Sequence, residues 1–142
     1  MTVDEALRDR LLSLTPVTAL VSTRIYCLIL PQAFNAPAIR IQRISQLEDM
    51  HLRGPVNVFR ARVQVDSIGL TRASAEAVDA AVQGDGLDSY ATGLKGFKGN
   101  IGSPAFVIRA ILPADVREFY DAEELRQFKV MRDFFVTFEG TH

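Results

Sequence analysis

The chain has 142 residues, 48% of them hydrophobic, which suits one domain with a single core. Sixteen basic and 17 acidic residues give a net charge of −1, which argues against recruitment of nucleic acid or an anionic membrane by bulk charge. The single cysteine, Cys27, excludes an intrachain disulfide, no apolar run reaches the ~20 residues that span a bilayer, and the acidic N-terminus is unlike a signal peptide. We therefore expect a soluble intracellular domain.

The first expected element is a helix over residues 3–14. Apolar side chains recur along it at helical spacing, and Thr2 with Glu5 three residues later forms a capping-box signature. Pro16 is expected to end this helix and to begin a short second turn that runs to Val21.

Two short strands are expected next. Residues 25–30 form an apolar, β-prone run that Pro31 closes, and residues 38–44 alternate between aliphatic and polar side chains. The following stretch, residues 47–57, combines charged residues with glycine, proline and asparagine, a composition that predicts a loop.

A longer strand, residues 57–68, shows the clearest pattern in the chain. Its side chains alternate in polarity, which is typical of a strand with one buried face. The apolar row is Phe59, Ala61, Val63 and Val65, and the polar row is Arg60, Arg62, Gln64 and Asp66. The polar row faces either water or another protein chain, and the pattern alone does not choose between them.

Thr71 is expected to cap a second helix that ends at Gly84. Six of the nine glycines lie in residues 84–104, which are therefore predicted to form a mobile loop. Apolar and alternating runs at 105–112 and 128–138 predict two final strands.

These elements together predict an α+β fold. We expect a mostly antiparallel sheet of four to five strands, covered on one face by two helices. The sequence shows no internal repeat and no domain linker, so residues 1–142 are expected to form a single domain.

No motif for catalysis or ligand binding stands out. The glycine-rich segment follows a helix and precedes a strand, and it lacks the Gly-Lys-Ser/Thr ending of a phosphate-binding loop. Cys27 lies in an apolar run, and the two histidines, His51 and His142, are too few to build a metal centre with it. We therefore expect no enzyme, no metal and no cofactor.

The order of several short motifs resembles one known family. In chain order the motifs are Thr15-Pro16-Val17, Arg24-Ile25-Tyr26, Leu30-Pro31-Gln32, Ala36-Pro37-Ala38-Ile39, Arg43-Ile44-Ser45, the run from Arg60 to Asp66, and Arg132-Asp133-Phe134. Over residues 5–138 this order is similar to that of the small tail-completion, or tail-terminator, proteins of long-tailed bacteriophages and of related particles such as gene transfer agents.

The resemblance implies a structural virion protein. Such proteins are α+β domains that form a hexameric ring on the head-proximal end of the tail tube, stop tube polymerisation and offer a docking surface to the head connector. The implied partners are other copies of the chain, the major tail tube protein and the connector or stopper protein, with DNA only in passage through the lumen and no membrane. The implied location is the tail–head junction of a virion made in the bacterial host cytoplasm.

Two groups of residues are predicted to act in assembly, the first from the resemblance and the second from its glycine-rich composition. The polar row Arg60, Arg62, Gln64 and Asp66 is predicted to contact a neighbouring subunit or the ring lumen, with a solvated strand face as the alternative. Leu94, Lys95, Phe97, Lys98 and Ile101 are predicted to form an assembly loop that becomes ordered on a neighbouring subunit or on the tube. An idle surface loop and a long hairpin packed on its own domain are the alternatives for this segment.

Two other functions stay open at this point. Another neck component, an adaptor or a stopper, is also a structural ring protein, although a helical adaptor would not show several alternating strands. A small-molecule-binding or enzymatic α+β domain would need convergent polar groups, which the sequence does not show.

Overall fold

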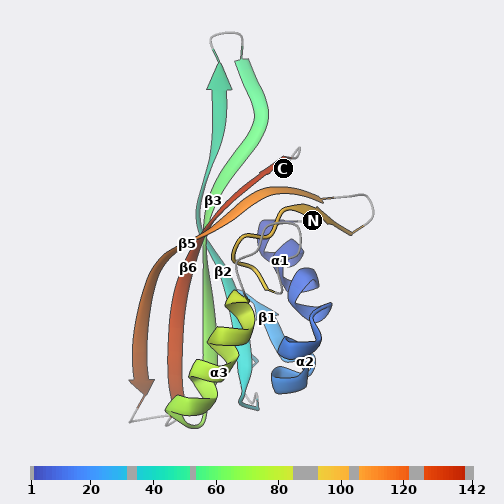
Figure 1. Cartoon of the computed structure of the whole chain (residues 1–142). Coiled ribbons are helices and arrows are strands. Elements are labelled where there is room, and N and C mark those ends of the chain that lie inside the picture. Colours follow the sequence, from blue (N-terminus) through green and yellow to red (C-terminus); the bar gives the residue numbers. More distant parts are fainter. Residues whose placement is uncertain are drawn as a thin grey trace.

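The computed structural model describes residues 2–31, 35–51, 54–84, 93–102, 106–121 and 127–139. These residues form three helices and six strands (Figure 1). In chain order the elements are α1 (Val3–Leu12), α2 (Thr15–Val21), β1 (Ile25–Cys27), β2 (Ala38–His51), β3 (Gly54–Gly69), α3 (Arg72–Gln83), β4 (Gly99–Ile101), β5 (Phe106–Asp121) and β6 (Gln127–Glu139).

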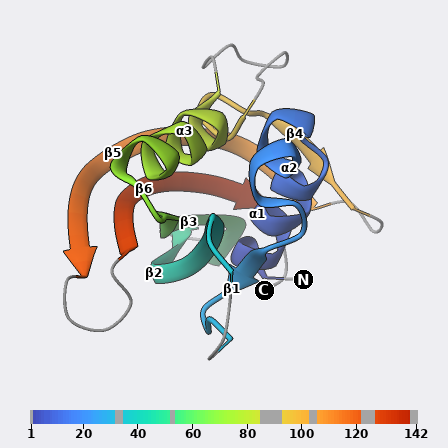
Figure 2. The same cartoon turned by 90° about the horizontal axis from the view of Figure 1, so that it is seen from below.

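The six strands form one sheet in the order β1-β2-β3-β6-β5-β4. β1 runs parallel to β2, and the other neighbouring pairs are antiparallel. The sheet is strongly curled, and the helices pack on one of its faces (Figure 2).

The predicted α+β class is confirmed, but the numbers of elements were wrong. The structure has six strands where four to five were expected, three helices where two were expected, and a parallel pair in a sheet expected to be mostly antiparallel. β1 lies within the strand predicted at residues 25–30, whereas β4 was not predicted, because a strand of three residues is too short for a period of two to identify. The short turn expected after Pro16 is a helix of its own, α2.

In the stretch predicted as a loop, residues 47–57, residues 47–51 are instead the end of β2 and residues 54–57 the start of β3. β2 continues to His51 and β3 begins at Gly54, with Leu47 opposite Arg60 and Glu48 opposite Phe59. This part of the hairpin extends well beyond the helices (Figure 1). Charged and turn-forming residues are compatible with a strand there, because pairing between the two strands does not require the segment to join the core.

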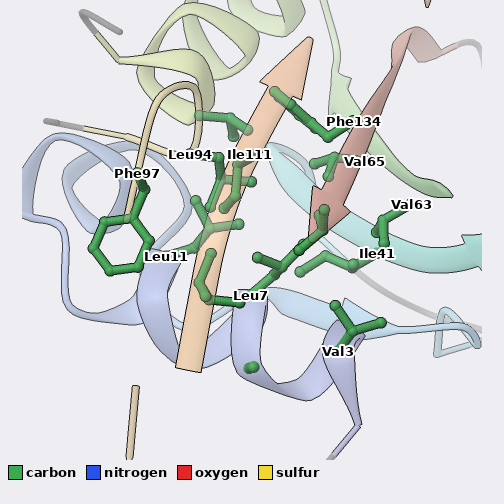
Figure 3. Packing of buried hydrophobic residues seen from close by; sticks show 14 of the residues in the cluster. Val3, Leu7, Leu11, Ile41, Val63, Val65, Leu94, Phe97, Ile111 and Phe134 are labelled. Atoms are coloured by element: carbon green, nitrogen blue, oxygen red, sulfur yellow. The ribbon is translucent and has the colours of Figure 1, made fainter. Parts of the chain in front are cut away.

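The apolar row of β3 is buried against the helices, as its alternation predicted. Figure 3 shows Val3, Leu7 and Leu11 of α1 gathered with side chains from β2, β3, β5 and β6. Among the largest fully buried side chains are Phe134 and Phe138 of β6. Each such apolar side chain stabilises the fold by about 1.5–3 kcal/mol relative to an exposed position.

The ends of α3 follow the predicted signals. The Thr71 hydroxyl accepts a hydrogen bond from the backbone N–H of Ser74 at 3.1 Å, and Gly84 takes a φ of 72° just after the last turn. Gly69 lets α3 approach β3 closely, because a Cβ at Gly69 would lie 2.6 Å from the backbone nitrogen of Ala75.

The capping box predicted at the start of α1 is confirmed only in part. Thr2 is the N-cap residue, but its side chain makes no hydrogen bond to the helix backbone. Its hydroxyl instead donates to the carboxylates of Asp4 and Glu5. The two acidic side chains lie in the first turn, where they also interact favourably with the helix dipole.

Candidate assembly surface

The polar row of β3 lies on the sheet face opposite the helices, which we call the open face. Arg40 of β2 donates two hydrogen bonds to Oδ2 of Asp66, from Nε at 3.0 Å and from Nη2 at 2.6 Å. The side-chain amide of Gln64 donates to Oδ1 of the same carboxylate at 2.7 Å. Asp66 is only 1% exposed, so partners within the chain balance its charge in place of water.

A second buried carboxylate on β6 is held in the same way. Arg62 donates to Oδ2 of Asp133 from Nε at 2.9 Å and from Nη2 at 2.6 Å. Arg117 of β5 donates to Oε1 of Gln64 at 3.2 Å and to Oδ1 of Asp133 at 3.4 Å, which links the two carboxylates. We call this set the polar network: Arg40, Arg62, Gln64, Asp66, Arg117 and Asp133.

The polar network changes the interpretation of the polar row. Asp66 is buried, Gln64 and Arg62 are half-buried, and Arg60 is exposed. The hydrogen bonds of the polar network join Asp66, Gln64 and Arg62 to residues of the same chain. Sequence analysis missed the partners Arg40 and Asp133, because strand neighbours cannot be read from the alternation of each strand alone. For Arg60 and the exposed part of Arg62, a contact with another subunit or the lumen stays a prediction.

A hollow of about 660 Å³ lies beside the polar network on the open face, with walls from β2, β3, β5 and β6. Three of its apolar side chains are exposed: Leu47 by 72%, Leu112 by 58% and Phe135 by 49%. Arg60, Arg62 and Arg109 also line the hollow. Exposed apolar and aromatic side chains next to arginines are the composition that protein–protein interfaces favour.

The predicted assembly loop is described only in part, because residues 85–92 and 103–105 lie outside the described residues. In the described part, Leu94, Phe97 and Ile101 are buried in the core of their own chain. This burial favours, for residues 93–102, the alternative of a segment packed on its own domain, and the ordering of the loop on a neighbouring subunit or on the tube stays a prediction. Lys95 is half-buried and Lys98 is exposed, so an assembly role for these two stays a prediction.

Two contacts fix this segment to the helices. The guanidinium carbon of Arg10 lies 4.0 Å from the centre of the Phe97 ring, a cation–π contact, and burial lowers the pKa of Arg10 from its usual value. The backbone N–H of Leu94 donates to the carbonyl oxygen of Val82 at 2.8 Å. No periodicity in the sequence indicates these contacts, because they join distant parts of the chain.

The described residues that could carry metal or thiol chemistry are few. No group of three or more histidine, cysteine, aspartate or glutamate side chains lies close enough to hold a metal ion within the described ranges. Burial, together with the nearby carboxylate of Asp4, raises the pKa of Cys27 to about 11, which keeps the thiol protonated and unreactive at neutral pH. The helices of the described segments are too short or too polar to cross a bilayer.

Comparison with known proteins places this geometry in context. A sequence model of the family described as "Tail completion protein gp17" matches residues 5–127. The chain belongs to this family. A solved structure described as "Virion of native gene transfer agent (GTA) particle" contains a chain with a similar fold: the TM-score is 0.64 and the identity 17%, over 97% of this chain and 95% of that chain. None of the curated proteins compared with the chain matches it.

The match confirms the resemblance drawn from the order of short motifs. Members of the tail completion family are structural components of phage and phage-like virions, so this protein is a structural tail protein and not an enzyme. An arrangement that buries its charges in pairs and leaves apolar side chains exposed on one face is consistent with a part that assembles with other proteins.

Proposed function

We propose that the protein forms a closed ring of six copies on the head-proximal end of the tail tube. There the ring ends tube polymerisation and joins the tail to the head connector. Its partners are then other copies of itself, the major tail tube protein and the connector or stopper protein, and DNA meets it only in passage through the lumen. Its location in the particle is the tail–head junction.

The observation that carries this proposal is the family match over residues 5–127, which covers most of the chain. The fold supports it, because the helices and the core lie on one face of the sheet and leave the other face available. That open face presents Leu47, Leu112 and Phe135, three large apolar side chains about half exposed or more. Exposed apolar clusters rimmed by polar residues commonly mark interaction sites on soluble proteins.

The long β2–β3 hairpin is a second supporting feature. It extends from the body of the domain (Figure 1), so it can reach a neighbouring protein without any change in the core. A ring that contacts a tube on one side and a connector on the other needs such contacts at two ends of the domain, and the hairpin provides one of them.

Removal of the gene from the phage or particle that encodes it tests the proposed function. Electron microscopy should then show tails of irregular length and tails not joined to heads, and expression of the intact chain from a plasmid should restore both. Tails of normal length that are joined to heads would contradict the proposal. Tails of normal length without heads would contradict the terminator role and favour a stopper or adaptor in its place.

A further inference from the structure

The distal half of β5 is exposed on both of its faces. Every residue from 112 to 120 is exposed, and the apolar ones among them are Leu112, Val116, Phe119 and Tyr120. One edge of this half pairs with β6. Along the other edge, β4 pairs only with residues 106–108, and the N–H of Gly96 bonds the carbonyl oxygen of Ile111 at 2.9 Å. In the part of the chain that the structure describes, no strand lies beside residues 112–121 on that edge.

β2 has a corresponding open edge at the other side of the sheet. β1 pairs with β2 as far as Ile41, whose carbonyl oxygen also accepts a hydrogen bond from the N–H of Leu28 at 2.8 Å. Among the described strands, none lies outside β2 from residue 42 to residue 51. Ile44 and Leu47 on this segment are 47% and 72% exposed. An exposed strand edge with apolar side chains is a site where another strand can add.

The short strands β1 and β4 restrict how a second sheet can approach. Leu47 of β2 is level with Ala110 of β5 across the sheet, and Ile41 is level with Val116. Residues 46–48 of β2 are therefore level with residues 108–111 of β5, beside β4 and Gly96, and residues 116–118 of β5 are level with the part of β2 beside β1. At the same level only residues 43–45 of β2 and 112–113 of β5 would meet, next to an irregularity in each strand, so a longer pairing requires a shift along the strands.

We propose that the open edge of β5 pairs with the open edge of β2 in the next copy of this chain, so that the ring is closed by intersubunit strand pairing. β2, β3, β6 and β5 alternate in direction, so β5 of one copy runs antiparallel to β2 of the next. The contact joins two different surfaces, as a closed ring of identical subunits requires. This inference rests on the proposed ring of copies.

Each edge has a regular segment that can take part in strand pairing. On β2 the irregularities fall between Arg43 and Ser45 and between Glu48 and Met50, so residues 45–48 are regular. On β5 the irregularity falls between Pro113 and Val116, and residues 116–121 are regular, which is long enough to accommodate residues 45–48. Bulges and Pro113 oppose pairing with arbitrary strands and confine regular pairing to these segments.

The register follows from the faces on which the side chains lie. Ser45 is opposite Arg62, and Phe119 is opposite Lys129, which places both side chains on the open face. Pairing residues 45–48 with 116–119 sets Ser45 opposite Phe119 and Leu47 opposite Arg117. A shift by two residues toward the end of β5, which pairs residues 45–48 with 118–121, would set Glu48 opposite Glu118. Directly opposed like charges destabilise a strand pair.

The shift between copies agrees with the geometry of closed sheets. The proposed register displaces the neighbour by ~6 residues, or ~20 Å, while the four long strands of one copy span ~19 Å across the sheet. The strands are then inclined to the ring axis by ~45°, at the upper end of the ~35–45° seen in closed sheets.

A disulfide between copies tests this interface directly. The variant carries Ser45→Cys and Phe119→Cys, with Cys27→Ser to remove the native thiol. Within one chain these two positions are ~20 Å apart along the strands, too far for a disulfide. In a facing antiparallel pair, in contrast, their Cα atoms are ~4.5–5.5 Å apart, close enough for a disulfide. The matched control replaces Phe119→Cys by Leu70→Cys, because Leu70 is also an exposed apolar residue but lies beyond the end of β3.

The protein is assembled alone and on tail tubes, oxidised, and compared by native mass spectrometry and non-reducing electrophoresis. We expect a series of covalent oligomers up to the size of the ring from Ser45→Cys with Phe119→Cys, and no such series from the control. A second pair, Leu47→Cys with Arg117→Cys, keeps Phe119 and should give the same series. Rings that form without these crosslinks would overturn the interface and leave the proposed function standing. If no ring forms even on tail tubes, the proposed function fails, and the interface fails with it.

Discussion

Two adjacent residues on opposite faces of β3, Val65 and Asp66, reach the same degree of burial by different means. Val65 is 0% exposed and Asp66 is 1% exposed, although they are adjacent and point to opposite faces of the sheet. Helices and apolar side chains cover Val65, whereas Arg40 and Gln64 surround Asp66. Alternation of polarity therefore predicts which residues share a face, but it does not predict that the residues of the polar face are exposed to solvent.

The two faces also differ in what holds them together. The covered face gains stability from apolar area removed from water, which requires no specific partner. The open face depends on pairs, so the loss of one partner leaves a buried charge without compensation. The covered face has one feature of the other kind, since Arg132 of β6 donates to both carboxylate oxygens of Asp79 on α3, at 3.0 and 3.1 Å.

The largest expected effect comes from emptying the covered face. Phe134→Ala removes a fully buried ring and should lower the free energy of unfolding by about 3–5 kcal/mol, because the cavity cannot collapse completely. The matched control is Phe135→Ala, the next residue on β6, which lies on the open face and is 49% exposed. We expect the control to cost less than about 1 kcal/mol in urea unfolding. Equal losses would show that the two faces are not distinguished as described.

A smaller loss is expected from the polar network. Asp66→Ala leaves the guanidinium of Arg40 without its carboxylate, and since Arg40 is 27% exposed and can turn toward water, we expect a cost of about 1–3 kcal/mol. The control is Glu76→Ala on α3, which breaks an exposed ion pair with Arg72 and should change stability by at most about 0.5 kcal/mol.

A double-mutant cycle sharpens this prediction. The combined variant Arg40→Ala with Asp66→Ala should lose less stability in urea unfolding than the sum of the two single variants, because it leaves no buried charge unpaired. Simple additivity would show that the two side chains are not coupled, and the polar network would then not stabilise the open face.

The N-cap of α3, the helix on the covered face, should contribute about 1 kcal/mol to the free energy of unfolding. Thr71→Ala removes the acceptor for the N–H of Ser74 and frees the first turn of the helix that covers β3 and β6. Thr71→Ser keeps the hydroxyl and should retain most of the stability in the same urea experiment. A loss as large for the serine variant as for alanine would assign the effect to the missing methyl group.

The last prediction concerns the reactivity of Cys27, where the effect on stability at neutral pH is the smallest. Because its pKa is raised to about 11, alkylation by iodoacetamide at pH 8 should be about 100-fold slower than for an ordinary thiol, and the rate should rise about tenfold per pH unit up to that pKa. The folded state favours the protonated thiol, so its contribution to stability is lost as the pH rises from about 9 toward 11. The urea-unfolded chain is the control, and an equal rate in both states would contradict burial of the thiol.

Sequence alone predicted the elements that repeat a pattern over many residues. The stripe of α1, the cap at Thr71 and the apolar row of β3 were each visible, because a period of 3.6 or 2 reports one buried side. The three-residue strand β4 and the strand residues at the far end of β2 and the start of β3 were not, because nothing in their composition distinguishes them from loops.

The candidate surface was predicted less completely than the fold. The polar row was found, but its intrachain partners on β2, β5 and β6 were not, because pairing between strands distant in sequence is a property of the assembled sheet. Leu94, Phe97 and Ile101 were predicted to be available to a partner because of the glycines around them. In the structure they are part of the hydrophobic core, and the N–H of Leu94 bonds the carbonyl oxygen of Val82 on α3, contacts that no local pattern encodes.

The most direct test of the account is an electron cryo-microscopy structure of the ring assembled on tail tubes. The account predicts a closed ring in which residues 116–119 of β5 pair antiparallel with residues 45–48 of β2 in the next copy, while Asp66 and Asp133 keep their arginine partners inside each subunit. A ring held together by its helices, with the edges of β2 and β5 still facing solvent, would contradict it.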